Sequence, residues 1–415
     1  MKKTWTLLLG SLALLFSCST PSEQEEVAAG ASLSGLWLAH IDMPAYSLPF
    51  ELEFEPSPEG TLVYARNADE RLLLDRVDQQ GDSLIISMGV FDAGLHLAPQ
   101  ADGTLRGRFT KYDVPGYSWP FRARTKQAAD TRFPVHFDPS VDFSGRYRVT
   151  FRHENGSSYE AIALLEQEGS LLTGTFLTAL GDYRFLEGRV EGDAFRLSTF
   201  NGSHLFYFEG NYRDRNNFTG IFRSGPSYLE SYSATRDADF QLPDADTLTQ
   251  LQEGEEQFDF TFPDLEGNPV SLSDPEFANK VVLVTLFGSW CPNCMDETAY
   301  LASWLKTQDE REVAVIALAF ERKDDFNYAV ERVKKSKERF QADFPFLIAG
   351  ESNKQKAAEK LPQLSAVIAF PTLIYLDRQH RVRKIHTGFS GPGTGEVYTA
   401  WTQQHEAFVQ RLLAE

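Results

Sequence analysis

The chain has 415 residues, of which 42% are hydrophobic, 13% aromatic and 24% charged, and its formal net charge is −19. This composition is typical of globular domains, and it excludes wholesale disorder, a collagen-like repeat and a membrane protein with many spans. A surface this acidic repels phosphate backbones, so we expect no nucleic-acid partner. The length predicts two or three domains, because single hydrophobic cores stop growing at about 250–300 residues.

The first 17 residues are typical of an export signal. Two lysines precede a short apolar run, residues 6–16, which is too short to cross ~30 Å of hydrocarbon as a helix. The run ends in Leu15-Phe16-Ser17-Cys18, which resembles the signal of bacterial lipoproteins. The resemblance implies lipidation of Cys18 and a location in the cell envelope, on a bacterial membrane and facing the periplasm or the exterior. The alternative is a plain secretory signal with an incidental cysteine.

Two similar β-rich units, residues 33–126 and 140–236, follow a polar, acidic stretch at residues 18–32 that predicts a flexible tether. Short aromatic or β-branched runs alternate with turn residues, as in half-buried strands. Ser34-Gly35-Leu36-Trp37 recurs as Ser144-Gly145-Arg146-Tyr147, about 110 residues later, which indicates an internal duplication. We therefore expect an all-β antiparallel region of barrels or sandwiches, either as two small domains or as one larger barrel.

The many tyrosines and tryptophans of the β-rich region have two interpretations. They could line a groove for a ligand or a polypeptide, or they could fill a β core and its surface, which is the commoner case. No group of His, Cys and carboxylate residues there has metal-ligand spacing, so we expect no metal site. After this region, residues 237–257 hold seven acidic residues and no basic ones, which predicts a solvated linker between domains.

A continuous apolar run, Val281 to Phe287, predicts a strand buried on both faces, as in the sheet of an α/β domain. A turn then leads to Cys291-Pro292-Asn293-Cys294, which opens a stretch from Met295 to Lys306 with leucines at helical spacing. A CxxC motif between a core strand and a helix start is typical of thioredoxin-like redox domains. Because a helix N-terminus favours negative charge, we expect a thiolate at Cys291. Cys294, one turn further in, should be shielded.

The motif and its flanks resemble the TlpA/ResA family of extracytoplasmic thiol–disulfide oxidoreductases. Trp290 precedes the first cysteine, and Glu297 follows the second by three residues. Three further segments are similar to the family's leading β-hairpin, its cis-proline strand and the strand that exits toward the last helix: Phe260 to Leu272, Phe370 to Asp377, and Arg381 to Phe389. The resemblance implies a thioredoxin-like domain at residues 258–415. One departure is Ala299, where the family commonly has a proline.

The resemblance also implies roles for the residues of the motif. Cys291 is the exposed attacking thiol and Cys294 the resolving thiol, so the expected redox group is their disulfide, with no other cofactor. Pro371, after a cis peptide bond, brings backbone close to the sulfurs and lets a substrate chain pair with Phe370. We therefore count Pro371 with the catalytic residues and Phe370, with Trp290, as the expected substrate site.

Two more residues of the motif have a functional and a structural interpretation. Glu297 lies near the cysteines in the family and takes part in proton transfer to the resolving sulfur, and residues three apart on a helix share a face. Its alternative is a first-turn glutamate that stabilises the helix dipole. Trp290 shapes the surface around Cys291 in one interpretation and only packs in the other.

The remaining segments predict the other elements of an α/β domain. Glu312 to Phe320 and Phe344 to Ile348 predict strands, and Gly395 to Leu413 predicts a closing helix. Asp324 to Phe340 predicts an amphipathic helix with a basic stretch that we interpret as a solvated face rather than a docking patch. That stretch comprises Arg332, Lys334, Lys335, Lys337 and Arg339.

Together these features predict a lipid-anchored enzyme that exchanges thiols and disulfides outside the cytoplasm, most simply a protein disulfide reductase. Its expected partners are protein thiols and disulfides, and the resemblance implies a membrane protein that supplies electrons. One alternative is a ligand- or protein-binding lipoprotein whose β-rich half carries the main function. A second alternative is a peroxiredoxin-like peroxidase, because Phe260 to Leu272 also resembles that family, although it needs Thr or Ser where Gly288 stands. A copper carrier needs a longer cysteine spacing with paired histidines.

Overall fold

The computed structural model describes Met1 and residues 33–415. The predicted signal beyond Met1, Cys18 and the predicted tether therefore lie outside the described residues. Three hydrophobic clusters organise residues 33–415, one in each half of the β-rich region and one in the C-terminal domain. Within the described part of the chain, no helix combines the length and the apolar character that crossing a membrane requires.

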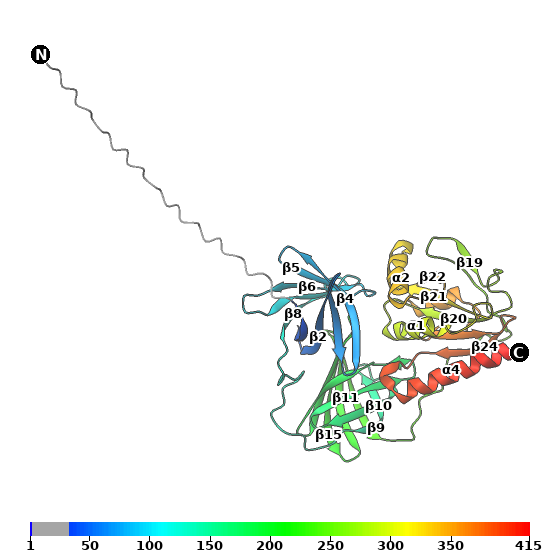
Figure 1. The fold of residues 1–415 in the computed structure, drawn as a ribbon. Helices are drawn as coiled ribbons and strands as arrows, with labels where there is room; N and C mark the ends of the chain where they lie inside the picture. Colours follow the sequence, from blue (N-terminus) through cyan, green and yellow to red (C-terminus); the bar gives the residue numbers. More distant parts are fainter. Residues whose placement is uncertain (2–32) are drawn as a thin grey trace. The chain divides into compact units, whose positions relative to one another are not determined.

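The first β-rich unit is a closed barrel in which each strand pairs with its sequence neighbour and the eighth strand returns to the first. Alternate side chains point inward. On the second strand Leu48, Phe50, Leu52 and Phe54 are all buried. The strands, at the blue end of the colour scale in Figure 1, are β1 (Gly35–Asp42), β2 (Ser47–Ser57), β3 (Gly60–Asn67), β4 (Glu70–Gln80), β5 (Ser83–Ser87), β6 (Ala93–Pro99), β7 (Leu105–Lys111) and β8 (Ser118–Thr125).

The second unit is also a closed antiparallel barrel, because its second and third strands pair with each other. Its strands are β9 (Gly145–His153), β10 (Ser158–Glu168), β11 (Leu171–Thr178), β13 (Leu186–Glu191), β14 (Ala194–Phe200), β15 (Leu205–Asp214), β16 (Asn217–Ser224) and β17 (Tyr228–Arg236). A two-residue strand, β12 (Gly181–Asp182), pairs only with β11. The all-β prediction is confirmed, and the choice left open by the sequence is decided in favour of two barrels.

Aromatic side chains fill the interior of the second barrel. Phe176 and Phe208 stack with their ring centroids 4.5 Å apart, and Phe151 contacts both Phe176 and Tyr232. These rings are all buried. Here the aromatic residues serve as a β core, which is the commoner of the two interpretations.

A buried arginine joins the two barrels. Arg132 donates to the carbonyl of Ser198 at 2.9 Å and to that of Arg66 at 2.8 Å, and it forms an ion pair with Glu187 at 3.3 Å. Its side chain is fully buried. Because its partners belong to both barrels, Arg132 fixes one barrel against the other.

The C-terminal domain has a five-stranded sheet in the order β22-β21-β20-β23-β24. The strands β20 (Val281–Phe287), β21 (Val313–Glu321) and β22 (Phe346–Glu351) pair in parallel, β23 (Thr372–Leu376) pairs antiparallel with β20, and β24 (Val382–Thr387) pairs antiparallel with β23. The helices are α1 (Pro292–Leu305), α2 (Phe326–Phe340), α3 (Lys354–Lys360) and α4 (Glu396–Ala414), with the short hairpin β18 (Thr261–Pro263) and β19 (Pro269–Ser271). The predicted α/β domain is confirmed.

The acidic linker is largely exposed, as expected of a solvated connector, but part of it also packs on the redox domain. Its residues include the 3-10 helix η1 (Ala245–Thr247), and Asp246 accepts a hydrogen bond from His386 at 2.6 Å. Thr249 is buried, with its hydroxyl 2.8 Å from that of Thr387. The physical reason is charge complementarity, because β24 presents His386 and Lys384 to the acidic segment.

The basic stretch of α2 is only partly solvated. Lys334 and Lys335 are half exposed, as expected. Arg332, however, is buried, donates to the carbonyl of Phe91 at 3.4 Å and lies 3.6 Å from the carboxylate of Asp92. The prediction of a solvated face is therefore wrong for this residue, because the loop before β6 offers it an acidic partner.

Candidate active site

The two cysteines lie at the start of α1, directly after the buried strand β20. Cys291 is the N-cap of the helix, and its sulfur accepts the backbone N–H of Cys294 at 3.2 Å. Pro292 occupies the first helical position, where its missing N–H costs nothing. Both thiols are free. A sulfur that receives an N–H at a helix N-terminus is placed where negative charge is favoured.

The peptide bond between Phe370 and Pro371 is cis, and it lies opposite the first cysteine. The Cys291 thiol donates to the carbonyl of Phe370 at 3.3 Å. Trp290 packs edge-on against the Phe370 ring, with centroids 5.6 Å apart, and its indole N–H donates to the carbonyl of Phe320 at 2.9 Å. The structure thus brings Trp290, Cys291 and the Phe370–Pro371 segment together at one end of the sheet.

Glu297 is fully buried in α1, one turn beyond Cys294. The hydroxyl of Thr285 donates to its Oε2 at 2.5 Å, while Oε1 has no hydrogen-bond partner in the structure. Burial raises the pKa of Glu297 to about 8, and the Thr285 hydroxyl opposes this shift. The carboxyl group is therefore able to hold or release a proton near neutral pH.

The two thiols have unequal surroundings. Cys294 is fully buried, and burial raises the pKa of its thiol well above the usual value, with Cys291 and then Glu297 adding to the shift. Cys294 is thus shielded, as its place in the helix predicts. Cys291 retains 5% exposure, so our expectation of an exposed thiol is wrong. Cys291 belongs to the hydrophobic cluster of the redox domain itself, and its sulfur lies 3.3 Å from the carbonyl of Phe370.

A second buried carboxylate near the motif was not predicted from the sequence. Glu321, at the end of β21, accepts the backbone N–H and the hydroxyl of Ser289, each at 2.8 Å. Burial raises its pKa to about 7, while the two bonds from Ser289 lower it. Because Ser289 lies two residues before Cys291, Glu321 fixes the turn that leads into the motif. The available signal was an acidic residue that ends an otherwise apolar strand.

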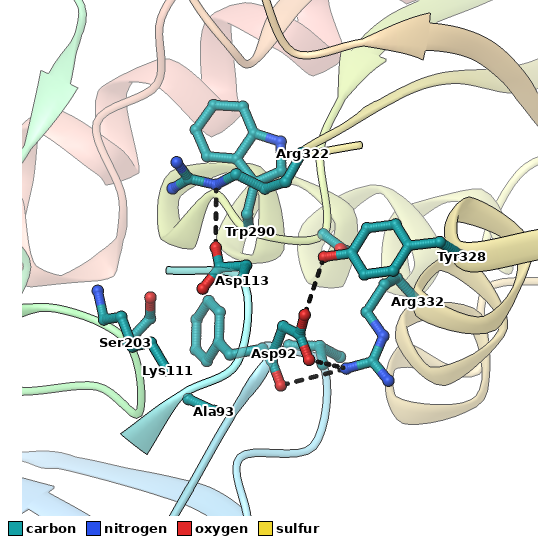
Figure 2. Close-up of a pocket in the computed structure, with 12 residues that line it drawn as sticks. Asp92, Ala93, Lys111, Asp113, Ser203, Trp290, Arg322, Tyr328 and Arg332 are labelled. Atoms are coloured by element: carbon teal, nitrogen blue, oxygen red, sulfur yellow. Dashed lines mark hydrogen bonds and ion pairs between the residues drawn. The ribbon is translucent and has the colours of Figure 1, made fainter. Parts of the chain in front are cut away.

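The first barrel contacts the site on the side of Trp290. Arg322 lies over the indole ring, 4.7 Å from its centroid, and forms an ion pair with Asp113 at 3.8 Å. Figure 2 shows these residues around a cavity of about 10 Å³, which has room for one water molecule. The thioether side chain of Met295, next to Cys294, packs into the hydrophobic cluster of the first barrel.

No group of three or more His, Cys, Asp and Glu side chains within residues 33–415 has an arrangement that could hold a metal ion. The protein groups that the site offers for chemistry are its thiols and carboxyl groups. A dithiol with one sulfur at a helix N-terminus and a second, protonated sulfur behind it is suited to thiol–disulfide exchange.

Comparison with known proteins gives matches to the C-terminal part of the chain. Residues 252–400 match the Redoxin family model. The thiol-disulfide oxidoreductase ResA of Bacillus thuringiensis is 29% identical over 133 residues, which are 32% of this chain and 68% of that protein. ResA of Geobacillus thermodenitrificans is 27% identical over 130 residues, or 31% of this chain and 66% of that protein.

Among solved structures, a secreted thiol-disulfide isomerase from Corynebacterium glutamicum is 21% identical, with a TM-score of 0.30, and the match covers 43% of this chain and 99% of that one. The thioredoxin domain of a thiol-disulfide oxidoreductase from Bacteroides vulgatus is 22% identical, with a TM-score of 0.28, over 37% of this chain and 98% of that one. The similarity to the relatives and the Redoxin match lie in the part of the chain that carries Cys291 and Cys294.

Proposed function

We propose that this chain is a thiol–disulfide oxidoreductase that reduces protein disulfides outside the cytoplasm, through Cys291 and Cys294. The observation that carries the proposal is the position of Cys291, which caps α1 and receives the N–H of Cys294 at 3.2 Å. The names of the matched relatives, the ResA oxidoreductases, support the same chemistry.

The reaction begins with the thiolate of Cys291 as nucleophile. It attacks one sulfur of a substrate disulfide, so that a mixed disulfide forms and the other substrate sulfur leaves as a thiolate and takes up a proton. Cys294 then loses its proton and attacks the sulfur of Cys291. The substrate's second thiol is released, and a Cys291–Cys294 disulfide remains. Two electrons and two protons pass from the dithiol to the substrate.

Glu297 is suited to accept the proton that Cys294 must lose. It lies one turn further along α1 and is fully buried, and one of its carboxylate oxygens has no hydrogen-bond partner among residues 33–415. Its raised pKa, about 8, brings it closer to that of a thiol than an ordinary carboxyl group would be. The carbonyl of Phe370, within hydrogen-bond distance of Cys291, marks where a substrate backbone would approach.

The location and the electron source complete the proposal. Cys18, at the end of the N-terminal apolar run, carries lipid that holds the protein on a bacterial membrane, facing the periplasm or the exterior. A membrane protein with its own dithiol reduces the Cys291–Cys294 disulfide after each cycle. Support for the anchor comes from the resemblance of the signal to those of bacterial lipoproteins, and support for the electron donor comes from the resemblance of the redox domain to the TlpA/ResA family.

A trapping experiment tests the proposed activity. In Cys294→Ala the mixed disulfide cannot be resolved, so we expect covalent complexes with proteins of the cell envelope that dissociate under dithiothreitol. The matched control, Cys291→Ala, should trap none, and the unmodified chain should reduce insulin. If neither variant forms complexes and the unmodified chain leaves insulin oxidised, the proposed activity is wrong.

A further inference from the structure

The hairpin that joins β11 to β12 in the second barrel, residues 178–183, lies against the rim of the redox site. A methyl group added at Gly388 would come within 2.7 Å of the backbone carbonyl of Leu180, and one added at Gly181 within 2.6 Å of the side-chain amide nitrogen of Asn293. Asn293 stands between the two cysteines. Because any side chain at Gly388 or Gly181 would collide with the residue that faces it, this close packing requires glycine at these positions.

Polar contacts hold the β11–β12 hairpin in this position. Asp182 accepts the backbone N–H of Gly391 at 2.5 Å, and its carboxylate lies 3.4 Å from the side-chain nitrogen of Asn293. That nitrogen also donates to the carbonyl of Phe389 at 2.8 Å. The hairpin, the CxxC loop and the segment after β24 are thus connected by one set of hydrogen bonds.

Arg184, directly after the β11–β12 hairpin, joins three parts of the protein. It forms ion pairs with Asp296 of α1 and Glu70 of the first barrel, and it donates to the carbonyl of Pro292 at 3.3 Å. Its side chain is only 7% exposed, so the ion pairs are shielded from water. Breaking buried pairs of this kind is costly, because a charge is left without a partner. Arg184 therefore connects the second barrel to α1 and to the first barrel, and we call this residue the latch.

The position of the β11–β12 hairpin limits what can reach Cys291. A protein disulfide must present both a sulfur and its flanking backbone to the loop of the CxxC motif, but Leu180 and Gly181 already lie on Asn293 and Gly388 beside it. At Trp290, the ion pair between Arg322 and Asp113 connects the site to the first barrel. Cys291 retains only 5% exposure, so we expect a small disulfide to reach it more readily than a folded protein does.

We propose that the β11–β12 hairpin is a lid, latched by Arg184, that must lift before a protein disulfide reaches Cys291, whereas a small disulfide reacts without lid movement. This selection by size rests on the proposed function, because it assumes that the dithiol reduces disulfides. It gives the second barrel a role in the choice of substrate.

The test compares two disulfides and two arginine variants in the full chain. The probes are the small aromatic disulfide 5,5′-dithiobis(2-nitrobenzoate) and insulin, each mixed with the pre-reduced protein. Arg184→Gln removes the latch. Arg132→Gln is the matched control, because Arg132 is also a buried arginine between β-barrel elements but contacts only barrel residues.

We expect Arg184→Gln to reduce insulin at least tenfold faster than the unmodified chain, with less than a threefold change toward the small disulfide. Arg132→Gln should leave both rates within threefold of those of the unmodified chain. Should Arg184→Gln fail to fold, the triple variant Arg184→Met, Glu70→Gln, Asp296→Asn removes the latch without leaving a carboxylate unpaired, and the same two rates are measured.

The outcomes separate the lid from the proposed function. If the unmodified chain and the latch variants reduce insulin at equal rates, the lid is overturned while the oxidoreductase activity stands. If no variant reduces either disulfide, the proposed function itself fails. If Arg132→Gln also reduces insulin tenfold faster than the unmodified chain, the effect comes from a general loosening of the barrels. That result would also overturn the lid.

Discussion

Cys291 and Cys294 differ in what surrounds each sulfur, although both lie on the first turn of α1. Cys291 receives a backbone N–H and donates to the Phe370 carbonyl, whereas Cys294 is fully buried and burial raises the pKa of its thiol. This difference fits two separate roles. Cys291 attacks the substrate disulfide, and Cys294 must lose its proton before it can attack the sulfur of Cys291. Glu297, one turn further along the helix, is placed to take that proton.

The ionisation of Glu297 should affect stability in a measurable way. Its pKa in the folded chain, about 8, lies above the ordinary value of 4.5, so its contribution to stability is complete below pH 4.5 and is lost as the pH rises through about 8. We predict that the unmodified chain loses about 1 kcal/mol relative to Glu297→Gln between pH 7 and pH 9. Urea unfolding of both proteins across this range measures the difference.

The same variant separates a proton acceptor from a structural residue. Glu297→Gln should slow the release of substrate from the mixed disulfide and abolish its dependence on pH near 8, without slowing the first attack by Cys291. A variant that keeps the pH dependence of substrate release would show that another group takes the proton from Cys294.

At the scale of elements, local patterns predicted the C-terminal domain well. The strand predicted from Val281 to Phe287 is β20, and the closing helix predicted from Gly395 to Leu413 is α4, Glu396–Ala414. Both elements are predictable from residues that lie close together in the sequence, because the strand is a continuous apolar run and the helix has a helical pattern of apolar residues. The position of the CxxC motif between strand and helix was predictable for the same reason.

Closure of the barrels and burial of Arg332 were not predictable, because both depend on partners far away in the sequence. The barrel closes only where β8 meets β1, and nothing in either strand alone specifies that pairing. A lysine or arginine on a helix is usually solvated, and Arg332 is an exception because Asp92 and the carbonyl of Phe91, both far away in the sequence, receive it. The burial of Cys291 was missed for a related reason, since it depends on packing against Phe370, 79 residues later in the chain.

The docking of α2 on the first barrel gives a prediction about stability. Arg332→Ala removes one partner of Asp92, which keeps Tyr328 and Lys323 nearby, and we expect a loss of about 2 kcal/mol in the free energy of unfolding. The control on the same helix is Lys335→Ala, which breaks an exposed pair with Glu331 and should cost less than about 0.5 kcal/mol. Equal losses in the two variants would contradict the docking role of Arg332.

For the whole molecule, the β-rich region and the redox domain share contacts that converge on the CxxC loop. The first barrel reaches it through Asp113 and the cluster around Met295, and the second through Asp182 and Arg184. These contacts connect the CxxC loop with the position of both barrels. In the proposed mechanism, the β-rich half thus takes part in the function.

The central claim is that Cys291 and Cys294 exchange two electrons with a disulfide as one unit. The direct measurement is to add limiting 5,5′-dithiobis(2-nitrobenzoate) to the fully reduced full chain and to map its disulfides by mass spectrometry. We predict one Cys291–Cys294 disulfide for each equivalent of the small disulfide consumed. Consumption of the probe while both cysteines remain free thiols, or no consumption at all, would contradict the claim.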